Sequence, residues 1–179
     1  MMRYPLSSIT IIFALVLATS YVASAQETLP LLDNVEPFLT TKKEFEARYG
    51  APVGKNGVDV FRYLVSGDKI DVEYSAGLCT ESRPYRLKKG VVLSYSIRFA
   101  KPILLKDLSI DFKRFSKDTS GDFPQVYQLI NDTDGIVLRV YQDPQESGTD
   151  TVFQIVKAAD IETKKAMQCP LGRGGPKWN

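Results

Sequence analysis

The chain has 179 residues, long enough to bury a core without metals or dense disulfides, and it carries a formal net charge of +2 and no histidine. The lack of histidine excludes catalytic sites of the Ser-His-Asp and Cys-His types, and also zinc sites that use imidazole. The near balance of charges leaves no field of one sign to attract nucleic acid or an anionic membrane, so we expect neither as a partner.

The first 25 residues are typical of a secretory signal peptide. Arg3 supplies the basic start, Ile9–Ala18 form an apolar run, and a small-residue cleavage site ends at Ala25. The alternative is a single-span anchor, but the apolar run is shorter than the roughly 20 residues that a span needs. We therefore expect a cleaved signal, a secreted or periplasmic product, and no membrane span after cleavage. The residue directly after the cleavage site is Gln26 and not a cysteine, so we expect no lipid anchor.

One helix is predicted after a lead-in over residues 26–37, which has no periodicity and is expected to be extended or mobile. Thr41 and Glu44 have the spacing of a capping box. Phe45 and Tyr49 form an apolar face, and Gly50 is a typical helix stop. Because this helix is short, it needs a sheet to pack on.

Three strands are predicted next, with apolar and polar residues in alternation. Phe61–Val65 and Ile70–Tyr74 flank a Ser-Gly-Asp turn, and Val91–Phe99 follow after a loop. This alternation is typical of an antiparallel sheet with one buried face and one face toward water.

The second half of the chain is similar to the first at an offset of 64 residues, which aligns Tyr63 with Tyr127. A helix beginning near Leu105, a hairpin over Val126–Gln142 and a strand over Thr151–Val156 repeat the earlier order. Leu108, Ile110 and Phe112 also alternate, so an extended conformation is the alternative for part of the segment from Leu105. We therefore expect an α+β fold of two tandem modules, residues 38–100 and 101–169. Each would be a helix plus a three-stranded antiparallel meander, with the helices on one sheet face. Residues 170–179 are expected to be a disordered tail.

Cys79 and Cys169 are the only cysteines. In an exported protein an even count predicts a disulfide, which here would join the two halves. The alternative is a pair of free thiols used in redox or nucleophilic chemistry.

The run Thr41–Pro52 (TKKEFEARYGAP), followed by a meander, resembles the module shared by the outer-membrane assembly lipoproteins and the β-lactamase inhibitor proteins. The inhibitors are built from two such modules, so the resemblance implies a tandem α/β fold. The run Val72–Cys79 (VEYSAGLC), with the later Cys169, also resembles a group of uncharacterised secreted bacterial proteins. The chain differs from the lipoproteins in lacking a lipid-bearing cysteine, and from the inhibitors in having one cysteine pair across its halves.

Paired carboxylates are the one catalytic arrangement that the sequence offers. Asp71 and Glu73 share a strand face about 6–7 Å apart, within the range of a glycosidase pair. The alternative is cross-strand pairing of these acids with Arg62 or Arg98. No Gly-rich phosphate loop follows a strand and opens a helix, so we expect no cofactor.

The face of the sheet toward water is the main candidate for function, because Arg and Tyr are residue types that anchor interfaces. The leading hypothesis is a non-catalytic binding protein that engages a protein or cell-envelope component through this face. The alternatives are a small hydrolase that uses Asp71 and Glu73, and a structural envelope protein without a specific ligand. The candidate binding residues are Arg62, Glu73, Ser96, Arg98, Arg139 and Tyr141.

Overall fold

The structure is a computed structural model that describes residues 29–77, 79, 85–121, 123–145 and 148–169. The predicted signal peptide and the predicted tail lie outside these residues.

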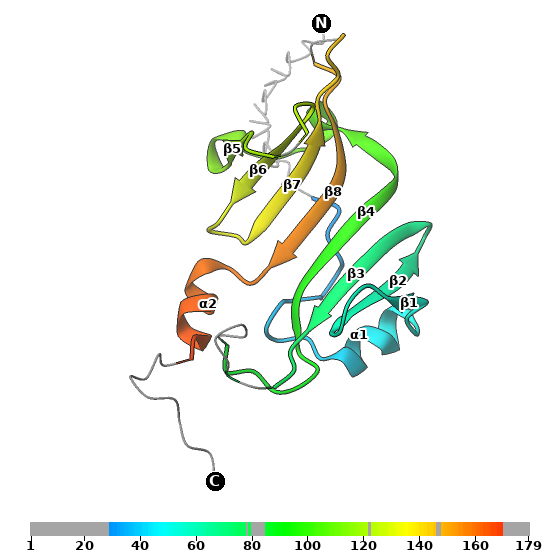
Figure 1. The fold of residues 1–179 in the computed structure, drawn as a ribbon, viewed down its shortest axis with the longest axis vertical. Coiled ribbons are helices and arrows are strands. Elements are labelled where there is room, and N and C mark those ends of the chain that lie inside the picture. Colours follow the sequence, from blue (N-terminus) through cyan, green and yellow to red (C-terminus); the bar gives the residue numbers. More distant parts are fainter. Residues whose placement is uncertain (1–28, 78, 80–84, 122, 146–147, 170–179) are drawn as a thin grey trace, which may run out of the picture.

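The described strands form a single antiparallel sheet of eight strands in the order β1-β2-β3-β4-β8-β7-β6-β5 (Figure 1). Two meanders, β2-β3-β4 and β6-β7-β8, meet where β4 pairs with β8, with Ile97 opposite Ile155. The strands are β1 (Gly54–Lys55), β2 (Val60–Val65), β3 (Asp68–Tyr74), β4 (Val92–Leu104), β5 (Ser116–Asp118), β6 (Val126–Asn131), β7 (Ile136–Tyr141) and β8 (Thr151–Ala158).

The predicted fold of two helix-plus-meander modules is wrong. All eight strands belong to one sheet, and the described helices are two short ones, α1 (Lys42–Tyr49) and α2 (Ile161–Met167). Because β4 and β8 pair directly, the halves share one sheet instead of standing as separate modules. The internal repeat and the α+β class are therefore not supported.

The helix predicted from Leu105 is replaced by two 3-10 turns, Leu105–Asp107 and Phe112–Arg114. Leu108 is buried against β6, β7 and β8, whereas Phe112 is 44% exposed. The apolar residues of this segment therefore do not form one helical face. The segment reaches the core through irregular backbone, which breaks the expected match with α1.

Helix α1 begins and ends as its sequence predicts. The Glu44 backbone N–H donates to the Thr41 hydroxyl at 3.3 Å, and the Glu44 carboxylate accepts from the Thr41 backbone N–H at 2.8 Å. The helix stops at Gly50, whose φ of 85° favours glycine. Phe45 packs on the rings of Tyr63 and Tyr49 at centroid distances of 4.7 and 4.8 Å. This helix therefore covers one face of β2 and β3.

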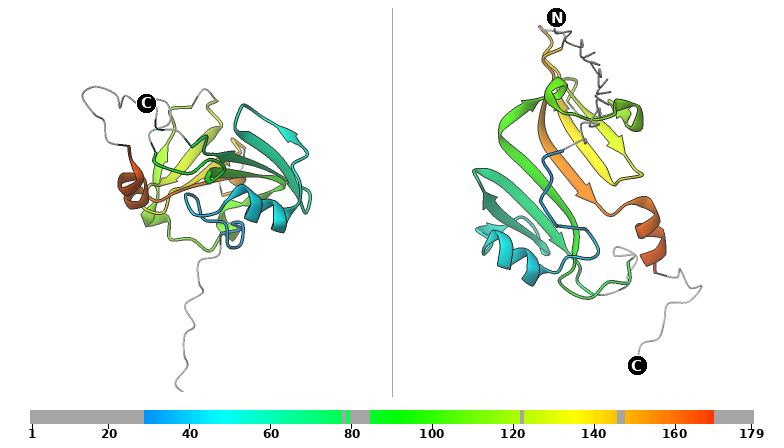
Figure 2. Two further views of the ribbon diagram at one scale, coloured as in Figure 1. Left: turned by 90° about the horizontal axis from the view of Figure 1, so that it is seen from below. Right: turned by 180° about the vertical axis from the view of Figure 1, so that it is seen from behind.

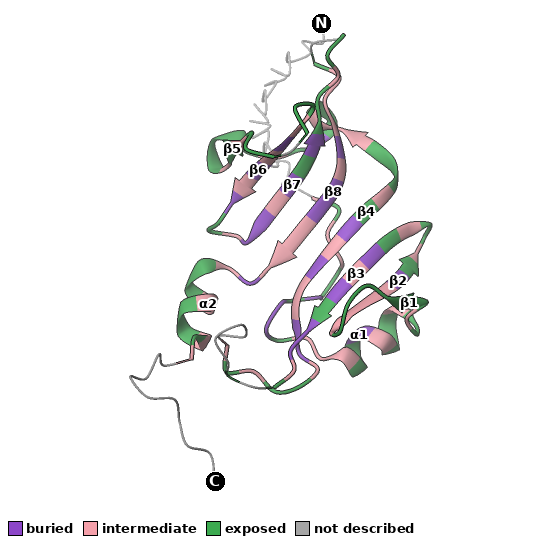
Figure 3. Cartoon of the chain, viewed as in Figure 1, coloured by how far each residue is buried: buried purple, intermediate pink, exposed green. Residues whose placement is uncertain are grey.

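Two clusters of buried side chains lie on the same face of the sheet, which we call the core face. Phe99 on β4 packs against both clusters. The alternation of buried and more exposed residues along the strands is visible in Figure 3. The first cluster is Val35, Phe45, Tyr63, Ile70, Val72, Tyr74, Val92, Tyr95 and Ile97. The second is Leu108, Tyr127, Leu129, Ile136, Leu138, Val140, Val152 and Ile155.

The N-terminal segment, residues 29–40, crosses the core face and contacts both clusters (Figure 2). Leu29 and Leu31 pack against the second cluster, and Leu32 and Val35 pack against the first. The described part of the predicted lead-in therefore contributes to the core.

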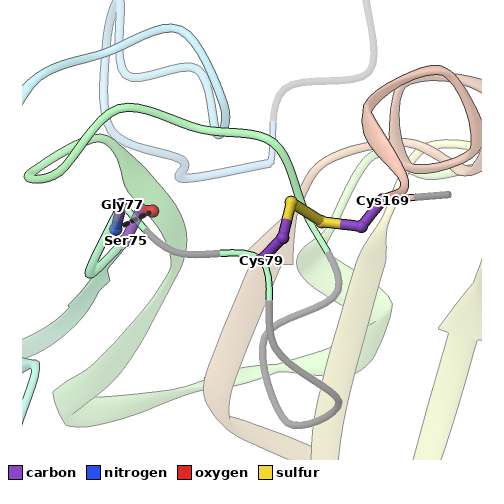
Figure 4. The surroundings of a disulfide bond; sticks show 4 residues. All are labelled: Ser75, Gly77, Cys79 and Cys169. Carbon is purple, nitrogen blue, oxygen red and sulfur yellow. Dashed lines mark hydrogen bonds between the residues drawn. A yellow bond between two sulfur atoms is a disulfide. The ribbon is translucent and has the colours of Figure 1, made fainter. Parts of the chain in front are cut away.

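The predicted disulfide between Cys79 and Cys169 is present, with a Cα–Cα distance of 6.0 Å (Figure 4). It joins the loop after β3 to the residues that follow α2. The Arg86 backbone N–H donates to the Met167 carbonyl at 2.8 Å, which adds a second link between the same two segments. Disulfides persist in oxidising compartments, so the bond is compatible with a secreted or periplasmic protein. In the described ranges, neither helix has the length and apolar character needed to cross a bilayer.

Candidate functional site

The face opposite both core clusters, which we call the outer face, carries all six candidate binding residues. The register of the strands arranges its side chains in rows that run across the sheet. One row is Arg62, Asp71, Ser96, Val156, Val137 and Ile130. The next row is Leu64, Lys69, Arg98, Gln154, Arg139 and Gln128.

Arg62 and Asp71 form a two-pronged ion pair between β2 and β3. The Arg62 Nε donates to Asp71 Oδ1 at 2.7 Å, and Nη2 donates to Oδ2 at 2.9 Å. Asn56 Nδ2 donates to the same Oδ2 at 3.1 Å. The hydrogen bonds from Arg62 hold the pKa of Asp71 below its usual range, against the opposing effect of burial. Arg62 is therefore already paired within the sheet.

Glu73 lies on the outer face two residues after Asp71, and its carboxylate accepts from the Ser94 hydroxyl at 3.1 Å. A glycosidase-type pair needs one protonated carboxyl whose pKa is raised. Asp71 has the opposite shift, and its carboxylate is occupied by Arg62. The geometry therefore favours cross-strand charge pairing as the explanation for Asp71.

Three cations stand in one row of the outer face. Lys69 on β3 is directly opposite Arg98 on β4, and Arg139 on β7 follows after Gln154 on β8. Arg139 Nη1 donates to Gln154 Oε1 at 3.2 Å, and Gln154 is buried with 6% exposure. Within the part of the chain that the structure describes, Lys69 and Arg98 form no ion pair. This row therefore places three positive charges on the outer face, and the charge of Arg98 also helps to lower the pKa of Asp71.

The remaining predicted residues flank this row. Ser96 is half-buried between Asp71 and Val156. Tyr141 lies two residues beyond Arg139 on β7, is 40% exposed, and donates through its hydroxyl to Gln125 Oε1 at 3.0 Å. The structure therefore brings Ser96, Arg98 and Arg139 near one another, with Glu73 and Tyr141 toward opposite ends of the face.

Sequence reasoning missed three parts of this face. Lys69 and Gln154 complete the basic row, and the half-buried Val137, Val156 and Ile130 form an apolar strip beside it. The alternation along β8 already indicates that Gln154 and Val156 share a face. Their position beside Arg98 and Arg139 depends on the pairing of β8 with both β4 and β7.

A comparison with family models, with curated proteins and with solved structures finds no match in any of the three. The resemblance to the lipoprotein and inhibitor module therefore remains a sequence-based expectation, and the tandem modules that it implied are not present. Among the described residues, no group of three or more Cys, Asp or Glu side chains is placed to hold a metal ion.

Proposed function

We propose that this protein is an exported, non-catalytic binding protein whose outer face engages an acidic surface of a protein in the cell envelope. The observation that carries the proposal is the row of Lys69, Arg98 and Arg139 on the outer face. Neighbouring strands lie about 5 Å apart, so the backbone positions of Lys69 and Arg98 are about 5 Å apart and those of Arg98 and Arg139 about 10 Å. This spacing suits a partner that presents several carboxylates.

Arg98 is the centre of the proposed contact. It lies on β4, in the middle of the sheet, and is exposed. Guanidinium groups bind carboxylates through two parallel hydrogen bonds. Arg98 acts on Asp71 through its charge but makes no ion pair at contact distance with a described carboxylate, so its guanidinium is suited to such recognition. Arg62 differs, because Asp71 already occupies its guanidinium.

The apolar strip beside the basic row supports a macromolecular partner over a small anion. Val137 and Val156 are half-buried on a face that packs neither core cluster, so they would lose further exposure under a partner. Removal of apolar area from water contributes roughly 25 cal/mol per Å². Tyr141, which lies beyond Arg139 on β7, is of a type enriched at interface centres.

The test is quantitative capture of partners from an envelope extract of the source organism, using the mature wild-type protein and two charge-matched variants. In the first, Lys69→Glu, Arg98→Glu and Arg139→Glu reverse the basic row. In the control, three exposed lysines are reversed on elements that pack on the core face. These are Lys43 in α1 and Lys106 and Lys113 in the 3-10 turns.

We expect the wild type and the control to retain the same protein, and the outer-face variant to lose it. Capture by the wild type should also fall as salt rises, because exposed ion pairs are screened. Equal capture by both variants would show that the outer face is not the contact. Retention of no protein by the wild type would favour a structural role without a specific ligand.

A further inference from the structure

A cavity of about 360 Å³ lies on the core face, where the N-terminal segment passes over β4 and the end of β8. Its volume is at the small end of the range of about 300–1,000 Å³ that is usual for ligand pockets. The lining combines apolar and polar side chains, and its exposed surface is slightly more polar than apolar. The lining residues are Leu31, Leu32, Asn34, Val35, Glu36, Pro37, Tyr95, Lys157, Ala158, Ala159 and Asp160.

Lys157 is the unusual member of this lining. It stands on the core face between Tyr95 of β4 and Ile136 of β7, both buried, in a position that alternation would give to an apolar residue. Its ammonium donates one hydrogen bond to the Asp134 carbonyl oxygen. Within the described ranges it has no carboxylate within ion-pair distance. Two of its three N–H donors are therefore left for water or a ligand.

Two of the three acids that act on Lys157 are held by other partners, and the third, Glu36, lines the cavity. The Asp134 carboxylate accepts from Arg114 at 2.6 Å, and that of Asp160 accepts from the Thr163 backbone and hydroxyl at 2.8 and 2.6 Å. Asp134, Asp160 and Glu36 favour the charged form of Lys157, whereas Lys164 opposes it. Burial is the larger effect and lowers the pKa of Lys157 below its usual value.

We propose that this cavity binds a small amphipathic carboxylate, with the carboxylate on the Lys157 ammonium and a short apolar body between Leu31, Val35 and Tyr95. The contact would supply the ion pair that the described protein groups do not. Because the cavity is small, the apolar part of the ligand can have only a few carbon atoms. This site lies on the core face, so it is separate from the proposed protein contact on the outer face.

The test uses three probes with the same six-carbon chain, which are hexanoate, hexan-1-ol and hexylamine. Calorimetric and NMR titrations of the mature wild-type protein should give saturable hexanoate binding with a Kd below about 1 mM. The alcohol and the amine should bind at least about tenfold more weakly, since they lack the charge-assisted hydrogen bond. Equal binding of the alcohol or the amine, or no saturation by hexanoate, would overturn the proposal.

Two variants locate the carboxylate. Lys157→Met keeps the length of the side chain without its charge and should weaken hexanoate binding by at least about tenfold. Lys164→Met, the control, removes a nearby charge that does not line the cavity and should leave the affinity within about twofold. Unchanged affinity in Lys157→Met, or an equal loss in both variants, would refute the assignment.

A readout in the wild type guards against a Lys157→Met variant that fails to fold. Hexanoate should raise the pKa of Lys157, followed through its side-chain NMR signals, because a neighbouring carboxylate favours the ammonium form. A pKa of Lys157 that does not move on saturation with hexanoate would place the ligand elsewhere.

Discussion

Removal of the Cys79–Cys169 disulfide should lower the free energy of unfolding substantially. The bond spans a sequence separation of 90 residues, from the loop after β3 to the end of α2. In the chain-entropy model, a closed loop of this length stabilises the folded state by about 4–5 kcal/mol, through its effect on the unfolded chain. That is a large part of the roughly 5–15 kcal/mol typical of a domain.

The assay is urea unfolding followed by circular dichroism, for the oxidised wild type and the Cys79→Ser, Cys169→Ser double variant. We expect a lower midpoint and a larger m-value in the variant, because its unfolded chain is less compact and exposes more surface. Wild type reduced with dithiothreitol is the control and should match the double variant. A loss of less than about 1 kcal/mol would refute the reasoning, since the loop-closure model would then have overstated the constraint on the unfolded chain.

Three further changes test the fold. Phe45→Ala should lower the free energy of unfolding in urea by about 3–5 kcal/mol, because this residue of α1 is 1% exposed and its ring packs on the sheet. A loss below about 1 kcal/mol would mean that the packing of α1 contributes little to stability. Asp71→Asn should remove part of the acid sensitivity of the protein. The folded-state pKa of Asp71 is lowered by Arg62, so its contribution is present above the unfolded pKa and is lost as pH falls through the folded pKa. Unfolding free energies of wild type and variant measured from neutral pH into acid should therefore converge at low pH, and parallel curves would contradict the assignment. Gly135→Ala should be strongly destabilising in thermal unfolding, because its φ is 65° and a Cβ would lie 2.5 Å from a carbonyl oxygen at the end of β8. Gly50→Ala is the matched control, because its φ is 85° and no atom lies within 4 Å of the added Cβ. It should cost only the backbone strain of about 1 kcal/mol. Equal losses of stability in the two variants would show that the close contact at position 135 is relieved.

Local features of the fold could be predicted from the sequence because their causes are local. The Thr41 and Glu44 capping pair specifies the start of α1 through two hydrogen bonds within one turn. The alternation in β3 placed Asp71 and Glu73 on one face, as found. The cysteine pair was predictable because the chain contains no other partner for either residue.

The pairing between the two halves could not be predicted, because alternation assigns a strand to a face and says nothing about its neighbours. Ile97 and Ile155 are suited to any buried row, yet only the folded sheet places them opposite each other. The segment from Leu105 fits both a helical and an extended period, so its packing decided between them. Leu29 and Leu31 carry no period, and their burial follows from the two clusters they cross. The basic row of the outer face depends on the same long-range pairing, so Arg98 and Arg139 were recognised as candidates but Lys69 and Gln154 were not.

The path of the N-terminal segment has a consequence for when the protein can fold. Leu29 and Leu31 dock on a cluster built from β6, β7 and β8, and β8 is the last strand among the described residues. Leu29 and Leu31 therefore cannot pack in the core until β8, far along the sequence, has joined the sheet. The central β4–β8 pairing is also long-range, and contacts of large sequence separation make folding slow. The core therefore cannot close until β8 has been made and is available to pair with β4 and β7.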